Sequence, residues 1–501
     1  MHSPSSTRAA ARARANARAH ARRSREFHRL EELLAQPRFR MIPIELLPHC
    51  AAVPLGVMVR GVMESLLDGE ALEELLRVHA PEQFTLELTI DALVNLLIQV
   101  SAGQRASVFA AYTADQAVPE PTISTSYQAL YGKLGRMNPN LSEAIVRYCA
   151  EKLRPILKKL PRAEEPILPG YRTRILDGNV LTGTDHRLGA LRQWLNACLP
   201  GKSLVILEPD LGLISDLVLC EDAYTQERAL LEYILDRVEP RDLLVFDRNF
   251  TTRGFAFGIA QRGAFFIGRQ HKINLPVTRL SKLVKCGKTE TGTIYEQTVQ
   301  ATDPETGATL LLRRIEIRLF EKTRDGERVI GLLTNLPATV SAPAIAEIYR
   351  KRWTIETQFQ LLTVSLHCEV PGLGKPKAAL FAFAMSLVAS NALAVVRGSL
   401  RAAHGKKAEA EVSGYYLADE ISAEFRTLAK YIPAEMWVGW RELGAEEMVS
   451  LLTEIARQVN IAELLRNQRG PKKPPDKKPV YSRKHNHFST YRIIDEAENP
   501  C

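Results

Sequence analysis

The sequence predicts an α/β core that carries a β-rich insertion and lies between helical N- and C-terminal regions. Three patterns support this fold class. Apolar residues three and four positions apart dominate residues 41–165 and 401–465, as in amphipathic helices. Between these regions, strand-like runs rich in Leu, Val and Ile alternate with helical patterns. Residues 262–335 hold further strand-like runs joined by Gly-containing turns, which predicts the insertion.

These patterns divide the 501-residue chain into five parts. We expect a basic, disordered arm at 1–40, a helical domain at 41–165, an α/β domain at 166–400, a second helical region at 401–465 and a basic Pro- and Lys-rich tail at 466–501. Exposed Arg and Lys on the first helical domain suit DNA binding, although no sharp helix-turn-helix signature is present.

Positive charge is concentrated at the two ends of the chain. The formal net charge is +9. Residues 1–40 carry an excess of about seven positive charges and residues 466–492 of about eight, so the body between them is slightly acidic. Basic ends on such a body favour an anionic polymer as partner. Solubilising tails would have the same composition and remain an alternative.

Composition also indicates the compartment. The seven Cys residues are scattered without a CxxC pair, which favours a reducing environment over a disulfide framework or a zinc site. The Arg- and Ala-rich start lacks the apolar segment of a secretory signal, and a basic arm is preferred over an organellar transit peptide. The apolar run 378–396 is long enough to cross a bilayer, but its Ala, Ser and Asn content favours a buried core helix. We expect a cytoplasmic protein with no membrane contact.

Two strand-like runs each lead to an aspartate. The alternating run 171–176 is followed by Asp177, and the buried-type run 241–247 ends on Asp247. Ligands of open α/β sheets collect at strand ends, so these carboxylates are candidates for a common site. A single Asp at a strand end is also a frequent turn or cap residue.

A third acid lies on a predicted helix, Tyr349–Thr363. At 100° per residue, Tyr349, Arg352, Glu356 and Thr363 fall on one polar stripe. A carboxylate beside a guanidinium suits a site for a metal ion and a phosphate. A solvated amphipathic helix with an i, i+4 Arg–Glu pair is the simpler alternative.

Together, Asp177, Asp247 and Glu356 could hold two divalent cations about 4 Å apart. Hard oxygen ligands favour Mg²⁺, or Mn²⁺. One ion would activate water or a 3′-hydroxyl, and the other would stabilise the leaving oxygen.

The spacing Y-x2-R-x3-E at Tyr349, Arg352 and Glu356, the ILDG motif around Asp177 and the LLVFDRNF motif around Asp247 resemble DDE-class insertion-sequence transposases of the insertion sequence 4 family. The resemblance covers roughly residues 165–400. It implies a ribonuclease-H-like catalytic core that cuts at the ends of a mobile element and joins the 3′-hydroxyl to target DNA. The DDE motif, read in order with a β-rich insertion before the Glu, is what makes the match specific.

The same resemblance assigns roles. It implies that Asp177, Asp247 and Glu356 are the catalytic metal ligands, and that Tyr349, Arg352 and the position of Thr363 contact DNA phosphate. The partners would be double-stranded DNA, both element ends and target, with a homodimer as the working unit and dimer contacts in 401–465. The location implied is the bacterial cytoplasm, at the nucleoid.

Two departures from the family pattern bear on activity. The pattern places Lys seven residues after the Glu, where this chain has Thr363, so positive charge is lost or comes from Lys375 or Lys377. Relatives that form DNA hairpins use a Trp in the β-insertion, whereas 262–335 has none. The aromatic residues that could stack instead are Phe265, Phe266 and Tyr295, and Trp353 is expected to be a core anchor.

The sequence therefore predicts a DNA transposase that works by two-metal-ion phosphoryl transfer. Two alternatives stay open. One is a catalytically impaired DNA-binding relative, which the loss of Lys at Thr363 makes plausible. The other is a metal-dependent nuclease that takes no part in transposition.

Overall fold

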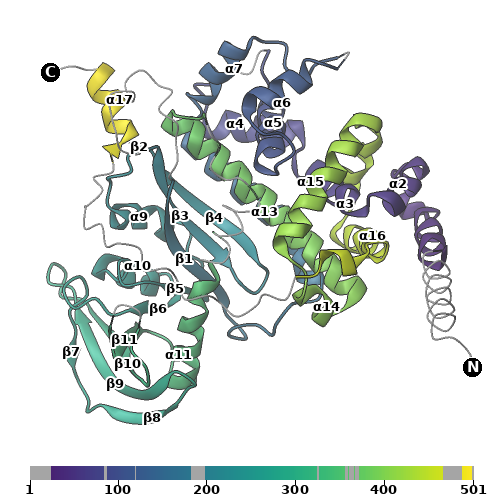
Figure 1. Cartoon of the computed structure of the whole chain (residues 1–501). Helices are drawn as coiled ribbons and strands as arrows, with labels where there is room; N and C mark the ends of the chain where they lie inside the picture. The colour runs from purple at the N-terminus through teal and green to yellow at the C-terminus, as the bar shows by residue number, and fades with distance from the viewer. Residues whose placement is uncertain are drawn as a thin grey trace, which may run out of the picture.

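The structure, a computed structural model, describes residues 24–83, 87–118, 120–181, 198–323, 326–355, 372–466 and 488–498, together with positions 359, 366 and 370. A body of helices lies beside one large mixed sheet (Figure 1). The predicted α/β class is confirmed, and the sheet is mostly antiparallel, with ten strands.

The first part of the described chain is helical throughout. Its elements are η1 (Pro37–Phe39), η2 (Ile44–Leu46), α2 (Leu47–Ala52), α3 (Pro54–Leu66), α4 (Gly69–His79), α5 (Ile90–Ser101), α6 (Val108–Asp115), α7 (Tyr127–Leu134) and α8 (Pro139–Lys159). Side-chain oxygens cap four of these helices: Asp68 caps α4, Ser107 caps α6, Ser126 caps α7 and Asn138 caps α8.

The expectation of a disordered arm over 1–40 is wrong for its second half. Residues 24–34 are helical, and Leu30 and Phe39 are fully buried. Phe27, Leu30 and Leu34 recur at helical spacing and form an apolar face, which the high Arg content of the segment obscured. Residues 24–40 are therefore not part of a disordered arm.

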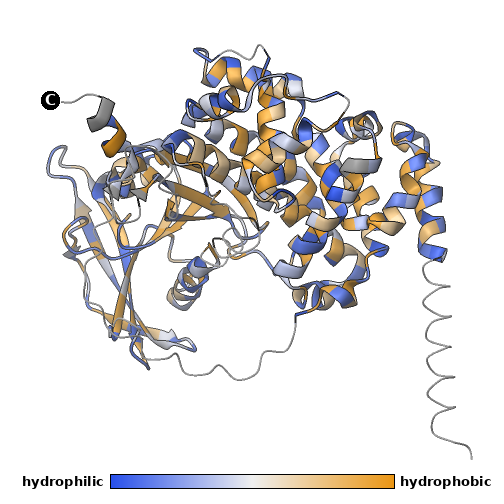
Figure 2. Ribbon diagram, turned by 45° about the horizontal axis from the view of Figure 1, so that its top comes forward, coloured by the Kyte–Doolittle hydropathy of each residue, from blue (hydrophilic) through white to orange (hydrophobic). Residues whose placement is uncertain are grey.

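The C-terminal helices pack into the same body as the N-terminal ones. They are α13 (Pro376–His404), α14 (Lys406–Ala410), α15 (Gly414–Tyr431), η6 (Ala434–Glu442), α16 (Ala445–Arg457) and η7 (Ile461–Leu464). α13 contacts α3, α5, α8 and α16, and α15 lies along α3. In Figure 2 hydrophobic residues, coloured orange, recur along these packed helices and along the strands of the sheet. The two helical regions predicted separately thus share one core.

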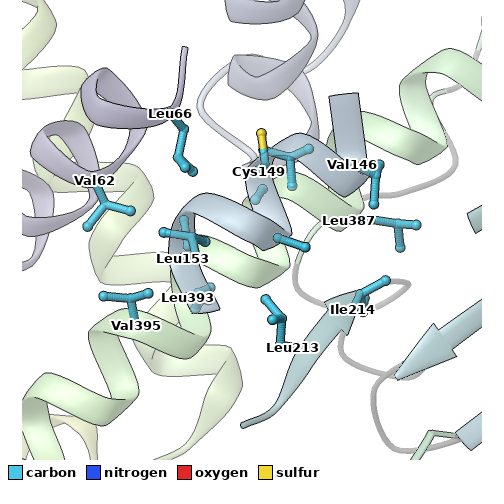
Figure 3. Close-up of a cluster of buried hydrophobic side chains, with 14 of the residues drawn as sticks. Val62, Leu66, Val146, Cys149, Leu153, Leu213, Ile214, Leu387, Leu393 and Val395 are labelled. Atoms are coloured by element: carbon cyan, nitrogen blue, oxygen red, sulfur yellow. The ribbon is translucent and has the colours of Figure 1, made fainter. Parts of the chain in front are cut away.

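α13 is the central helix of that core. Its apolar window is long enough to cross a membrane, but 89% of the window is buried inside the protein, as expected of a core helix. Figure 3 shows its side chains meeting those of α3, α8 and β4. Asn391 is buried among them because its amide bonds both backbone groups of Ile214, at 2.8 and 2.9 Å. Each Leu or Val buried in such a core contributes roughly 1.5–3 kcal/mol.

Five strands form the half of the sheet nearest the helices. They are β1 (Arg172–Leu181), β3 (Gly201–Glu208), β4 (Leu213–Cys220), β5 (Asp242–Phe246) and β6 (Phe265–Arg269). Their order is β4-β3-β1-β5-β6, with β4, β3 and β1 antiparallel and β1, β5 and β6 parallel. The helical elements η4 (Glu227–Leu230), α9 (Leu231–Leu235) and α10 (Arg253–Gln261) share a hydrophobic cluster with one face of these strands.

The β-rich segment extends the same sheet. Its strands are β7 (Thr278–Arg279), β8 (Val284–Lys288), β9 (Gly292–Thr302), β10 (Thr309–Leu319) and β11 (Val329–Thr334). β11 pairs antiparallel with β6, and β10 and β9 follow it. The strands expected within 262–335 are present, but β6 among them belongs to the parallel part of the sheet. The chain then turns into α11 (Ala342–Arg350) and η5 (Lys351–Trp353).

The far C-terminus returns to the sheet side of the molecule. β12 (Phe488–Ser489) pairs in parallel with β2 (Cys198–Leu199) and leads into α17 (Thr490–Glu498). Arg492 donates to Asp222 at 2.8 Å. The segment predicted as a basic tail over 466–501 therefore contains a strand and a helix that contact the rest of the protein. Ile493 of α17 is buried in this contact.

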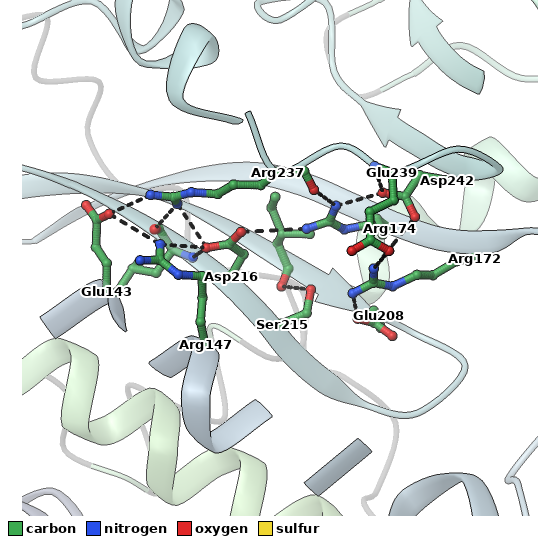
Figure 4. A network of polar contacts seen from close by, with 12 residues as sticks. Glu143, Arg147, Arg172, Arg174, Glu208, Ser215, Asp216, Arg237, Glu239 and Asp242 are labelled. Atoms are coloured by element: carbon green, nitrogen blue, oxygen red, sulfur yellow. Dashed lines mark hydrogen bonds and ion pairs between the residues drawn. The ribbon is translucent and has the colours of Figure 1, made fainter. Parts of the chain in front are cut away.

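A buried polar network joins α8 to the sheet (Figure 4). Arg237 donates to Glu143 of α8 at 2.8 Å and to Asp216 of β4 at 2.9 Å. Arg174 of β1 donates to Asp242 of β5 at 2.8 Å, with both side chains almost fully buried. Because removing one member of a buried ion pair costs about 3–5 kcal/mol, this network fixes the helical body against the strands that carry the candidate site.

Candidate active site

Asp177 and Asp247 come together at one edge of two parallel strands. β1 and β5 pair as far as Leu176 and Phe246, and each aspartate is the next residue along the chain. The residue before each aspartate is fully buried, whereas the aspartates are partly exposed. The two carboxylates therefore lie where a charged ligand can reach them at the rim of the core.

The strand that carries Asp177 does not end there, contrary to the sequence prediction. β1 continues to Leu181, and Asp177 pairs with Val205 of β3. The apolar alternation stops after Leu176, where the pairing of β1 with β5 ends, whereas the antiparallel pairing with β3 continues to Leu181. Asp177 therefore has an extended backbone that pairs with β3 but no longer with β5.

Arg352 binds Asp177 directly. Its Nη1 donates to Asp177 Oδ2 at 2.8 Å, and the two side chains are 12% and 18% exposed. The other carboxylate oxygen accepts the backbone N–H of Gly178 at 3.0 Å. At such low exposure the pair is screened less than a surface ion pair. Asp177 therefore carries a compensated negative charge at this rim.

Tyr349 completes this group on the α11 side. Burial raises the pKa of the Tyr349 phenol, against the opposing effect of Arg352 and Arg269. The phenol is hydrogen-bonded to Arg352. It stays neutral at physiological pH, so it can donate a hydrogen bond to an anionic ligand.

The single helix predicted for Tyr349–Thr363 is not continuous. α11 ends at Arg350, and the chain tightens into the 3₁₀ turn η5 over Lys351–Trp353. The chain is helical again at Thr354, Ile355 and Phe359, so the interruption is a single tightened turn that follows Tyr349 and contains Arg352. Glu356 and Thr363 lie outside the described residues.

Arg269 also faces the site, and sequence reasoning missed it. It ends β6, the next parallel strand after β5, and it pairs with Glu327. Burial, and after it the charge of Arg248, lower the pKa of the Arg269 guanidinium, whereas Tyr349 and Asp247 raise it. Its position at the end of a buried parallel strand is the same signal that identified Asp247.

Asn249 and Glu227 are further neighbours that the sequence did not single out. The backbone N–H of Asn249 donates to Asp247 Oδ1 at 2.7 Å, and its amide donates to Glu227 Oε2 at 2.7 Å. Asn249 lies within the LLVFDRNF motif, so its proximity to Asp247 was accessible from sequence. Glu227 reaches the site through a tertiary contact for which no local pattern exists.

The donor set is suited to a hard cation. Asp177 and Asp247 present carboxylate oxygens from adjacent strands, the ligands that Mg²⁺ and Mn²⁺ prefer. Within the described ranges no group of three or more His, Cys, Asp or Glu residues could hold a metal ion. Two carboxylates are only part of such a site, and Glu356, the third ligand predicted from the sequence, lies outside the described residues.

The aromatic candidates differ from expectation. Trp353 is 64% exposed and follows Arg352 directly, so it is not a core anchor. Phe266 is fully buried and unavailable for stacking on a base. Phe265 packs edge-on against Tyr171, and Tyr295 is covered by Arg318 at 4.1 Å.

The lysines that could replace the family Lys are engaged elsewhere. Lys377 lies 3.8 Å from Glu221. The Lys375 side chain packs at Gly135, at the end of α7. Among the described residues, Arg352 pairs with Asp177, and Arg269 interacts with the charge of Asp247.

Comparisons with known proteins identify the domain in which Asp177 and Asp247 lie. The model of the family described as "Transposase DDE domain" matches residues 168–382, which supports a DDE transposase and agrees with the span of the sequence resemblance. No curated protein matches the chain. A solved structure of the piggyBac transposase synaptic complex with hairpin DNA is similar at 12% identity and a TM-score of 0.35, covering 85% of this chain and 88% of that one.

Proposed function

We propose, from the match of residues 168–382 to a transposase DDE domain, that this chain is a DNA transposase of the insertion sequence 4 type. It cleaves at the ends of its element and joins the freed 3′-hydroxyl to target DNA. The observation that carries the proposal is the adjacency of Asp177 and Asp247 at the ends of paired parallel strands, with Arg352 bound to Asp177 at 2.8 Å.

The strand order supports a ribonuclease-H-like core for residues 166–400. Three antiparallel strands, β4, β3 and β1, are followed by two parallel ones, β5 and β6. The first strand of the set is central and carries Asp177, and its parallel neighbour leads to Asp247. On this reading β7–β11 are the insertion that separates the fifth core strand from α11.

The proposed chemistry divides among named residues. Asp177, Asp247 and Glu356 are the ligands of two Mg²⁺ or Mn²⁺ ions, which when bound activate the attacking oxygen and stabilise the leaving one. Arg352 leaves Asp177 for a phosphate oxygen of DNA, which it can bind bidentately. Tyr349 donates to the same strand, and Thr363 provides a hydroxyl where the family pattern has Lys.

The remaining parts of the chain serve DNA and assembly. The helical domain 41–165 binds the element end, and helices of 401–465 supply contacts in a homodimer. Because both helical regions share one core with α13, DNA bound to the first is held in fixed relation to the aspartates. The proposed location is the bacterial cytoplasm, at the nucleoid.

Cleavage of a labelled duplex that carries the flanking element end tests this function. Native chain should nick the end with Mg²⁺ or Mn²⁺ and produce strand-transfer product, and Asp177→Asn, Asp247→Asn and Glu356→Ala should each abolish nicking. Asp236→Asn is the matched control, because Asp236 is 77% exposed and pairs with Arg262 away from the site.

The alternatives give different results in the same assay. End binding without nicking by the native chain would indicate the impaired DNA-binding relative. Nicking without preference for the element end, and without strand transfer, would indicate a nuclease.

A further inference from the structure

We propose that Glu227 is a positioning residue that fixes Asp177 and Asp247 relative to one another. This inference rests on the proposed function, because it concerns the geometry of the same metal-binding aspartates. Glu227 touches the backbone next to one aspartate and a side chain next to the other, so a single carboxylate links the two strands that carry them.

The first contact is at Gly178, the residue after Asp177. A Cβ added to Gly178 would lie 2.2 Å from Glu227 Oε1 and 2.7 Å from its Cδ. Contacts this short do not occur, so the Glu227 carboxylate occupies the space that any other side chain would fill. Gly178 is required here for this close approach.

The second contact is at Asn249, two residues after Asp247. Glu227 Oε2 accepts the Asn249 amide at 2.7 Å, and the Asn249 backbone N–H donates to Asp247 Oδ1 at 2.7 Å. The loop that orients Asp247 is therefore connected to β1 through the Glu227 carboxylate.

The element that carries Glu227 is itself well anchored. Leu230 and Leu231 are buried in the same cluster as Leu176 of β1. Successive strand residues point to opposite faces, so Gly178 and Leu176 share the face on which η4 lies, and Asp177 points to the other. Glu227 thus supports β1 from behind, opposite the Asp177 side chain.

This placement predicts an effect on cation affinity. Two carboxylates hold one cation well only if their separation is fixed before binding, and loss of an outer partner of a metal ligand typically costs about 10–100-fold in affinity. Glu227 lies on the face of β1 opposite the Asp177 side chain, and its Oε2 accepts the Asn249 amide. Glu227 therefore acts through the aspartates rather than as a ligand.

The test is direct Mn²⁺ binding to the full-length chain by calorimetry, with thermal unfolding of the metal-free protein measured in parallel. Glu227→Ala should weaken Mn²⁺ binding at least tenfold with little change in Tm, because Glu227 is partly exposed. Glu227→Gln keeps the shape and an oxygen acceptor for Asn249, so it should bind Mn²⁺ within a few-fold of the native chain. Asn249→Ala should weaken binding as Glu227→Ala does, and the two changes combined should add little.

Asp177→Asn separates the two hypotheses. If native chain binds Mn²⁺, Asp177→Asn does not, and Glu227→Ala binds like native, the positioning role is overturned while the proposed function stands. If Glu227→Gln loses Mn²⁺ as completely as Asp177→Asn, the Glu227 charge is needed at the metal and the positioning role is again overturned. If native chain binds no Mn²⁺, the proposed function fails, and the role of Glu227 fails with it.

Discussion

Arg352 Nη1 donates to Asp177 Oδ2 at 2.8 Å and thereby neutralises one of the two aspartates that the sheet brings together. The same oxygen would be needed by a divalent cation, and the same guanidinium by a DNA phosphate. The ion pair therefore holds both binding groups in place while neither ligand is bound, and it must open before either can bind.

Replacing Arg352 should separate these two roles. Arg352→Gln removes a competing positive charge, so Mn²⁺ should bind the DNA-free chain more tightly, by about tenfold for each 1.4 kcal/mol of repulsion removed. Cleavage of the element end should nevertheless fall, because the phosphate contact is lost. Calorimetry and the nicking assay measure the two effects. Weaker Mn²⁺ binding in Arg352→Gln would show that the guanidinium supports the cation site instead of competing with it.

Trp353 should contribute to DNA binding and not to stability. Its ring is 64% exposed beside Arg352, and stacking of one base on an aromatic ring contributes about 1–3 kcal/mol. Trp353→Ala should weaken binding of the element end about tenfold or more, with Tm almost unchanged. Trp437→Ala is the contrasting variant, because Trp437 is buried and its truncation should lower Tm strongly. Equal DNA affinity in native chain and Trp353→Ala would exclude a stacking role.

Thr363 tests whether the departure from the family pattern limits activity. Thr363→Lys restores a positive charge seven residues after Glu356, so it should raise the rate of end cleavage at saturating Mg²⁺. Thr363→Ala measures what the hydroxyl itself contributes. A slower Thr363→Lys enzyme would mean that the site depends on the hydroxyl and that Arg352 and Arg269 already supply the charge.

Local sequence patterns were sufficient to predict much of the fold and part of the candidate site. The buried-type strand before Asp247 and the alternating run before Asp177 were recognisable because apolar periodicity reports burial directly. Their pairing in parallel explains why the two aspartates meet. The change from α-helix to a 3₁₀ turn after Arg350 could not be predicted from apolar periodicity. Over a single turn, apolar residues three positions apart fit both kinds of helix.

Tertiary contacts account for what the sequence did not reveal. Glu227 meets Gly178 across 49 positions of the chain, a contact that only the packing of η4 on β1 produces. Asn391 can be buried within the apolar helix α13 because its amide bonds the backbone of Ile214, a contact that the sequence does not show. Trp353 was expected in the core because large aromatic residues are usually buried, whereas its position in η5 points it to solvent.

Stability of the helical body should decrease as pH rises from about 4.5 to about 7. Burial raises the pKa of the Glu424 carboxyl from 4.5 to about 7, although it accepts the Gly56 N–H at 2.5 Å. The folded state then binds this proton more tightly than the unfolded chain, so its contribution is full below pH 4.5 and is lost toward pH 7. At 1.36 kcal/mol per pKa unit, the change is on the order of 3 kcal/mol.

Thermal unfolding of native chain and Glu424→Gln between pH 5 and pH 8 measures this effect. The Gln variant keeps an oxygen acceptor for Gly56 and cannot ionise, so its Tm should fall less than that of native chain over this range. Parallel pH profiles for the two proteins would mean that Glu424 does not carry the dependence.

The basic residues of the C-terminal tail should set part of the salt dependence of DNA binding. Six Lys and Arg residues lie between positions 472 and 484, and each phosphate contact contributes about 0.9 to the slope of log K against log salt. Replacing these six residues with Gln should flatten the slope by the number of contacts they make. Deletion of 466–501 is a poorer test, because it also removes Arg492, which pairs with Asp222 at 2.8 Å, and the strand β12. An unchanged slope in the Gln variant would leave the tail without a role in DNA binding and assign the phosphate contacts to the helical body and the sheet.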